Sequence, residues 1–109
     1  MKLITKEIEE ALKKYPLYSQ DGKGSDAVCS AKFFFPCGAW TWYITEANLD
    51  TGELFGVTIN STGEGEYGYI SLSELLNLKV MGLGVERDKT FKPKPLKEIN
   101  DPYLKNFLN

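Results

Sequence analysis

The chain contains no histidine among its 109 residues, and this absence excludes several classes of enzyme. Ser–His–Asp and Cys–His nucleophilic sites need an imidazole as their general base, and the common zinc hydrolase sites use imidazole as a metal ligand. Only carboxylate, lysine or tyrosine chemistry is left. The segment Gly22-Lys23-Gly24-Ser25 lacks the spacing and the strand-to-helix context of a phosphate-binding loop. We therefore expect no cofactor and read this segment as a surface loop.

Cysteine and long apolar runs are also scarce. The two cysteines, Cys29 and Cys37, are too few for a structural zinc site. We expect both as free thiols, with a disulfide across a tight hairpin as the alternative. The apolar run Phe33–Pro36 is far too short to span a bilayer, and residues 1–14 are charged and amphipathic rather than signal-like. These features predict a cytoplasmic protein with no membrane partner.

The charge is small but unevenly distributed. The net charge is −2, and residues 46–88 contain eight acidic residues but only Lys79 and Arg87 as bases. Residues 89–97 contain four lysines and no acid. Proteins that grip nucleic acid rely on Lys and Arg contacts to phosphate, so direct nucleic-acid binding is not expected.

Hydrophobic periodicity predicts one domain over residues 1–109. Thr5 caps a helix that ends before Pro16, Ser71-Leu72-Ser73-Glu74 forms a capping box, and Asp101-Pro102 begins a last helix. Alternating apolar residues and short Gly-containing turns predict strands at 27–35, 39–47, 53–60 and 66–71, with a fifth, edge-like strand at 85–91. The fold class is therefore α+β, with a four- to five-stranded antiparallel meander and short helices packed on one face.

The aromatic run Trp40-Thr41-Trp42-Tyr43 is the densest feature. Its period of two directs both tryptophans into the core and Tyr43 to the opposite face, close to Tyr67 or Tyr69. Exposed tyrosines there would either anchor a protein partner or form ordinary cross-strand pairs on a solvated face. The sequence leaves both readings open.

Acidic residues of the middle segment are the second candidate site. Two carboxylates can perform acid–base chemistry or bind a divalent cation, although no metal-loop spacing is present. The alternatives are a solvated acidic surface, or an acidic face that fits a basic groove on a nucleic-acid enzyme. In Glu86-Arg87-Asp88, a strand would place the two acids on one face and Arg87 on the other, in a structural ion pair. The candidate acids are Glu64, Glu66, Glu86 and Asp88.

A basic segment, Lys92-Pro93-Lys94-Pro95, must be extended because proline restricts itself and its predecessor. It either touches a phosphate or a groove in a partner, or is a solvated linker, and we expect the linker. An exposed sheet edge, or the apolar stripe around Phe107, would allow a homodimer as well as a monomer.

Six ordered segments of the chain resemble a family of small bacterial proteins of unknown function that is common on plasmids and conjugative elements. The resemblance covers nearly the whole chain and implies a setting on mobile DNA, with no catalytic residues to transfer. The segments are Tyr18–Gly24, Ala31–Phe34, Trp40–Glu46, Phe55-Gly56, Gly68–Leu75 and Glu86–Asp88.

The setting implied by this resemblance suggests an anti-defence protein of anti-CRISPR or anti-restriction type, not an enzyme, that binds a CRISPR effector or a restriction nuclease. One alternative is a regulatory module that binds a protein encoded by the mobile element. Another is a carboxylate- or metal-dependent enzyme. The partner-binding residues expected for the inhibitor are Tyr43, Glu64, Glu66, Tyr67, Glu86 and Asp88.

Overall fold

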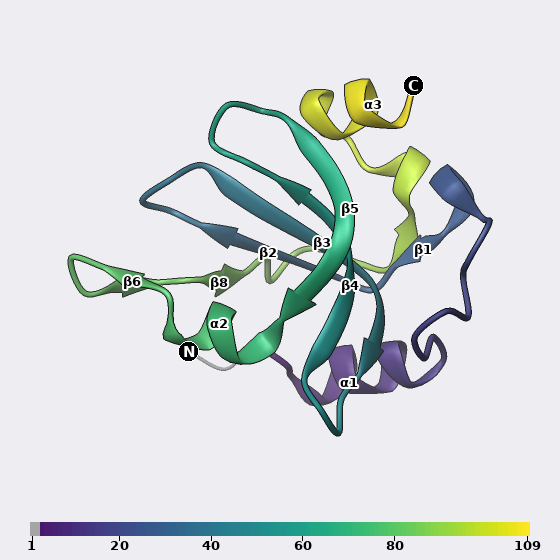
Figure 1. Cartoon of the computed structure of the whole chain (residues 1–109), viewed down its shortest axis with the longest axis horizontal. Coiled ribbons are helices and arrows are strands. Elements are labelled where there is room, and N and C mark those ends of the chain that lie inside the picture. Colours follow the sequence, from purple (N-terminus) through teal and green to yellow (C-terminus); the bar gives the residue numbers. More distant parts are fainter. Residues whose placement is uncertain (1–2) are drawn as a thin grey trace.

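A five-stranded antiparallel sheet forms the centre of the computed structural model, which describes residues 3–109 (Figure 1). The strand order β5-β4-β3-β2-β8 confirms the predicted meander, and the short fifth strand joins it beside β2 at the far edge. The predicted α+β class is thus confirmed. The strands of this sheet are β2 (Ala31–Phe35), β3 (Trp40–Asn48), β4 (Glu53–Ile59), β5 (Gly65–Ser71) and β8 (Glu86–Arg87).

The single strand predicted for residues 27–35 is two strands with different partners. β1 (Val28–Cys29) pairs with β9 (Lys94–Pro95), whereas β2 pairs with β3 and β8. Between β1 and β2, the Ser30 amide donates to the Ile44 carbonyl at 2.8 Å. The predicted solvated linker at 92–95 is therefore wrong, because its second half is a docked strand. A pairing partner so distant in the chain leaves no local signal in the sequence.

Three short helices begin at the residues that their capping signals predict. Thr5 Oγ1 accepts from the Ile8 amide, Ser71 Oγ from the Glu74 amide, and Asp101 Oδ1 from the Tyr103 amide. Such bonds satisfy N–H groups that the first turn leaves free. The helices are α1 (Lys6–Lys13), α2 (Leu72–Asn77) and α3 (Pro102–Leu108), with 3-10 turns η1 (Gly24–Asp26) and η2 (Leu96–Glu98).

No helix in residues 3–109 has the length and apolar character needed to cross a membrane.

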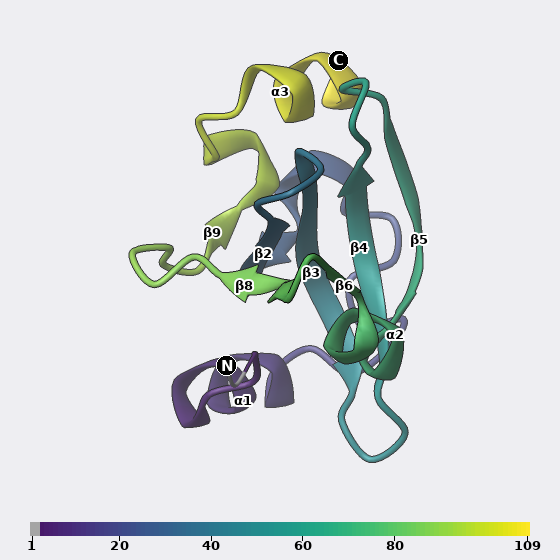
Figure 2. The same ribbon diagram turned by 90° about the vertical axis from the view of Figure 1, so that its left-hand side faces the viewer.

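Both faces of the sheet are covered, which corrects the prediction that the helices share one face. Leu12 of α1 and Leu75 of α2 join a core with Trp42, whereas Leu104 of α3 joins a second core with Tyr43. Since Trp42 and Tyr43 are consecutive in β3, these cores lie on opposite faces. In Figures 1 and 2, α3 lies at the top and α1 at the bottom, with the sheet between them.

The two tryptophans of β3 share a face but not an environment. Trp42 is buried in the first core, as predicted. Trp40 is 37% exposed at the end of the strand, and its ring stacks on Trp42 with 6.2 Å between centroids. The expectation that both are core residues thus holds for Trp42 alone.

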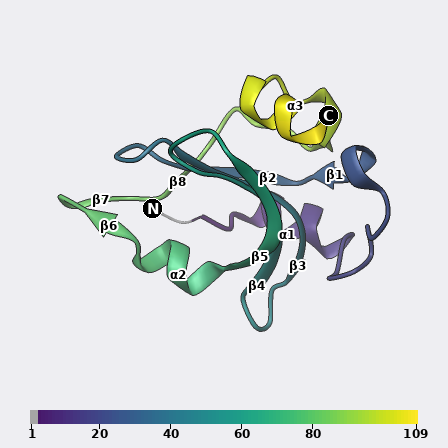
Figure 3. The same cartoon turned by 45° about the horizontal axis from the view of Figure 1, so that its top comes forward.

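Residues 79–84 form a small hairpin that the sequence patterns did not predict. β6 (Lys79–Val80) and β7 (Leu83–Gly84) pair across a turn in which Met81 and Gly82 have φ of 53° and 78°. Positive φ at both central residues is the geometry of a type I′ turn. Figure 3 shows the hairpin projecting from the body of the protein, and Met81 is fully exposed at its tip.

Candidate functional site

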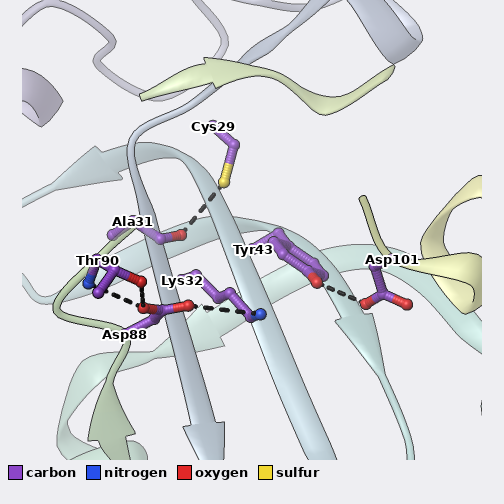
Figure 4. Close-up of polar contacts among 7 residues, drawn as sticks. All are labelled: Cys29, Ala31, Lys32, Tyr43, Asp88, Thr90 and Asp101. Atoms are coloured by element: carbon purple, nitrogen blue, oxygen red, sulfur yellow. Dashed lines mark hydrogen bonds and ion pairs between the residues drawn. The ribbon is translucent and has the colours of Figure 1, made fainter. Parts of the chain in front are cut away.

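Tyr43, the tyrosine expected on an open surface, is completely buried, so that expectation is wrong. Leu96, Ile99 and Leu104 of the C-terminal segment cover it in the second core. Its hydroxyl donates to Asp101 Oδ2 at 2.5 Å (Figure 4). Burial, and then this hydrogen bond, raise the pKa of Tyr43 above its ordinary value. Tyr43 therefore ties α3 to the sheet and is not part of the exposed surface.

The four candidate acids do not form one surface. Glu64 and Glu66 lie at the hairpin between β4 and β5, whereas Glu86 and Asp88 lie on and after β8. Strands β5 and β8 are opposite edges of the sheet. The two pairs thus belong to separate surfaces, because the meander separates these edge strands by three others.

Asp88 has a structural role at its edge. It forms an ion pair with Lys32 at 3.6 Å and accepts hydrogen bonds from the Thr90 amide and hydroxyl (Figure 4). Partial burial opposes ionisation, but the bonds from Thr90 and the charge of Lys32 together lower the pKa of Asp88. In β8, Glu86 pairs with Phe34 and Arg87 with Phe33, so their side chains take opposite faces as predicted.

Tyr67 is exposed as expected, and it belongs to a larger aromatic surface. Phe55 of β4 stacks on Tyr67 with 6.4 Å between ring centroids, and meets Tyr69 edge-on at 5.4 Å. Tyr67 also contacts Phe107 of α3 at 5.1 Å, and the Tyr69 hydroxyl donates to the Tyr18 hydroxyl at 3.0 Å. We call these five residues the aromatic stripe. Its three tyrosines are 46% (Tyr67), 55% (Tyr69) and 62% (Tyr18) exposed.

Each end of the aromatic stripe depends on a close contact. At the α3 end, a Cβ on Gly65 would lie 2.7 Å from the Phe107 ring, so only glycine lets this ring rest on β5. At the other end, the hydrogen bond from Tyr69 to Tyr18 raises the pKa of Tyr69 to about 12. Nearby acids, Glu53 and Asp21, act in the same direction. This end of the stripe therefore lies beside carboxylates.

A buried carboxylate, absent from our predictions, holds the loop that carries Tyr18. Glu46 is 3% exposed and accepts from the Tyr18 amide at 2.6 Å and from the Gln20 amide at 2.9 Å. The Gln20 side chain in turn bonds to backbone groups of Val28 and Thr45. The available signal was an acid that follows six aromatic, apolar and Thr residues in its strand, since a buried charge needs fixed partners.

Tyr18 adopts a strained backbone conformation in this loop. Its φ is 75°, in the left-handed region that non-glycine residues seldom occupy, and such strain costs on the order of 1 kcal/mol or more. The two charge-assisted bonds to Glu46 offset this cost. The fold thus maintains a strained residue whose ring is mostly in solvent, beside Tyr69. Strain of this kind is found most often at functional sites.

The open hollows at both ends of β5 carry acids. One is lined by Glu53 and Glu74 with Tyr69, and the other by Glu64 and Glu66 with Trp40. Among residues 3–109, no lysine or arginine lines either hollow. The surroundings of β5 are therefore electronegative as well as aromatic.

The described residues contain no group of three His, Cys, Asp or Glu side chains arranged to hold a metal ion. Both cysteines are free thiols, as expected. Cys29 is buried and donates to the Ala31 carbonyl, and burial raises the pKa of its thiol to about 12. A thiol of this kind is a poor nucleophile. Cys37 is exposed.

Comparison with known proteins gives a family without a described activity. No curated protein and no solved structure matches the chain. A family model with the description "Protein of unknown function (DUF2958)" matches residues 3–100. These residues include the nine described strands and the loop in which Glu46 holds Tyr18. The match spans nearly the whole chain, and the protein therefore belongs to the DUF2958 family.

Proposed function

We propose that this protein is a stoichiometric, non-enzymatic inhibitor that binds a protein partner through the aromatic stripe. The partner is a nuclease complex of a defence system, either a CRISPR effector or a restriction enzyme, met in the cytoplasm. The single observation that carries the binding part of the proposal is the strained, anchored Tyr18 beside the exposed Tyr69.

Exposed tyrosines are frequent anchors of protein interfaces, because they bury a large ring and keep a polar tip. The alternative of plain cross-strand pairing accounts for Phe55, Tyr67 and Tyr69, because Phe55 pairs directly with Tyr69 and lies diagonally from Tyr67 on the adjacent strand. It does not account for Tyr18, which lies outside the sheet and reaches the stripe only by way of a strained backbone. A binding role accounts for both features.

Electrostatics support a basic partner. The hollow lined by Tyr69 contains Glu53 and Glu74, and the hollow at the other end of β5, on the opposite face of the sheet, contains Glu64 and Glu66. Among the described residues no base lines either hollow, and the net charge of the chain is −2. Nucleases line their DNA or RNA path with Lys and Arg, so an acidic protein surface complements it and speeds association. The resemblance to proteins of plasmids and conjugative elements supplies the setting for this choice of partner.

The test is plasmid transformation into cells with and without an active CRISPR or restriction system. We expect the protein to raise transformation only where the defence is active, and Tyr67→Ala combined with Tyr69→Ala to abolish the effect. Met81→Ala, which truncates an exposed apolar residue away from the stripe, is the matched control. No rise in any of several systems would overturn the anti-defence role and favour a partner encoded by the mobile element.

A second pair of variants tests the acids at the two edges of the sheet separately. Glu64→Gln with Glu66→Gln neutralises the hollow next to β5, and Glu86→Gln neutralises the opposite edge. The proposal expects a loss of protection from the first variant and none from the second. Full protection by the first variant would exclude the acids as part of the contact surface.

A further inference from the structure

The outer edge of β5 is a long, regular strand edge, and no strand within residues 3–109 pairs with it. β5 has seven residues and pairs with β4 in continuous register from Glu53↔Ser71 to Ile59↔Gly65, without a bulge. It contains no proline and no lysine, and its one charged residue is Glu66. Proteins normally use proline, lysine or other charged residues to protect an edge strand from pairing, or make the strand short. The other edge, β8, is protected in that way, since it has two residues.

Two backbone bonds define which groups of β5 point outward. The Asn60 amide donates to the Glu64 carbonyl, and the Leu72 amide donates to the Gly52 carbonyl. Hydrogen-bonded and non-bonded pairs alternate along an antiparallel ladder. The even-numbered residues 66, 68 and 70 therefore bond to β4, and the odd-numbered residues direct their N–H and C=O groups away from it. These outward residues are Gly65, Tyr67, Tyr69 and Ser71.

Two residues of β5 thus belong both to the outward backbone edge and to the aromatic stripe. Tyr67 and Tyr69 offer outward N–H and C=O groups along the edge and mostly exposed rings on one face. A strand added to this edge would pair with the backbone and place alternate side chains against the rings. Both surfaces then serve one binding event.

The charges around β5 select a basic occupant. Glu66 lies near one end, and Glu53 pairs with Ser71 at the other. Residues 66 and 71 are an odd number of positions apart, so the two carboxylates lie on opposite faces, about 17 Å apart along the strand. An extended segment with two basic residues five positions apart would meet both acids. Tyrosine rings also attract Lys and Arg side chains.

A second copy of the chain fits this edge poorly. An antiparallel β5–β5 pair would bring the glutamates of the two hollows of both copies together, and no base of the part of the chain that the structure describes lines either hollow. Such like-charge contacts disfavour the pairing. A lysine- or arginine-containing partner gains from the same groups.

We propose that β5 accepts an extended, basic segment of the protein partner as a sixth strand, with its backbone paired to Tyr67 and Tyr69. This inference rests on the proposed function as a protein binder and specifies how the partner is held. It does not depend on which defence protein supplies the segment.

The test uses a blocked eight-residue peptide of alternating threonine and valine, with lysine at its second and seventh positions. The matched control peptide has glutamate at both positions. Nuclear magnetic resonance follows binding to the whole protein through amide exchange. We expect the lysine peptide to bind at least about tenfold more tightly and the preference to shrink with salt. The amides of Tyr67 and Tyr69 should become protected, while those of Gly68 and Ile70, already bonded to β4, should change little.

Two variants separate backbone pairing from ring contacts. Tyr67→Val keeps the outward N–H but loses the ring, whereas Tyr67→Pro loses both and is tolerated at an outward edge position. The proposal expects the lysine peptide to bind Tyr67→Val more weakly than the parent protein and not to bind Tyr67→Pro. Amide exchange in the unaltered protein shows whether the backbone of β5 pairs with the peptide, even if the proline variant fails to fold.

Three results would overturn the proposal. The first is equal binding of the two peptides, and the second is protection that avoids Tyr67 and Tyr69. The third is a dimer, detected by sedimentation equilibrium, in which the amides of Tyr67 and Tyr69 are protected without peptide. The peptide test is independent of the cellular one. Peptide binding without protection of plasmids would refute the anti-defence role and leave the strand-addition mode intact. Protection of plasmids without peptide binding would refute the strand-addition mode and leave the anti-defence role intact.

Discussion

Replacing the buried Glu46 by glutamine tests whether this residue holds Tyr18 in the aromatic stripe. The substitution keeps the volume but turns one of two acceptor oxygens into a donor that faces a backbone N–H. A hydrogen bond to a charged group contributes about 1.5–3 kcal/mol, and the amide is less costly to bury than the carboxylate. We therefore expect Glu46→Gln to lower the free energy of unfolding by about 2 kcal/mol.

In a domain of this size, that loss lowers the melting temperature by roughly 10 °C. Urea unfolding followed by tryptophan fluorescence measures the stability. Absorbance titration of the tyrosines measures the second effect, since the pKa of Tyr69 should fall from about 12 toward its ordinary value once Tyr18 is released. Tyr18→Phe is the matched control, because it removes the hydroxyl partner and leaves the anchor in place.

The control variant should lower the pKa of Tyr69 with little change in stability. Glu46→Gln should change both measurements. An unchanged unfolding midpoint together with an unchanged Tyr69 titration would refute the role of Glu46 as the anchor of this loop.

Three further predictions concern the core. Tyr43→Phe removes the bond to Asp101 and should cost about 1.5–3 kcal/mol in urea unfolding. Because the folded state raises the pKa of Tyr43, its contribution is complete below about pH 10 and is lost as the pH rises further, and the variant should show a weaker alkaline decline. Gly56→Ala places a Cβ 1.9 Å from the Tyr43 carbonyl oxygen and should cost about 3 kcal/mol, whereas a stability within 1 kcal/mol of the parent would contradict this close approach. In the native protein, iodoacetamide should modify Cys37 rapidly and Cys29 only on unfolding, as mass spectrometry can show.

Local patterns in the sequence predicted the elements well, because their causes are local. Alternation marked β3 and β4, and the caps Thr5, Ser71 and Asp101 marked all three helices. The environment of Tyr43 could not be predicted in this way. Threonines flank it, as on a solvated face, and the residues that cover it come about fifty positions later.

The candidate site was predicted only in part, for a similar reason. Tyr67 was correctly expected on the surface, but its neighbours Tyr18 and Phe107 come from distant segments that no spacing rule joins. The four acids were grouped by their closeness in sequence, yet strand order places them on opposite edges. Strand order depends on long-range pairing such as β2 with β8, which composition and periodicity do not encode.

The pairing of β1 with β9 has a consequence for how the chain folds. The meander β2–β5 consists of neighbours in sequence and can form early, because closing short loops costs little entropy. The face that carries Tyr43 stays open until residues 94–104 dock, since Leu96, Ile99 and Leu104 cover it and the pairing of β9 with β1 joins this segment to the sheet. During synthesis, the half-finished molecule therefore carries a sheet with one bare apolar face, a form prone to aggregation. The rate of this last docking step, rather than the speed of sheet formation, governs how long the nascent protein is exposed to that risk.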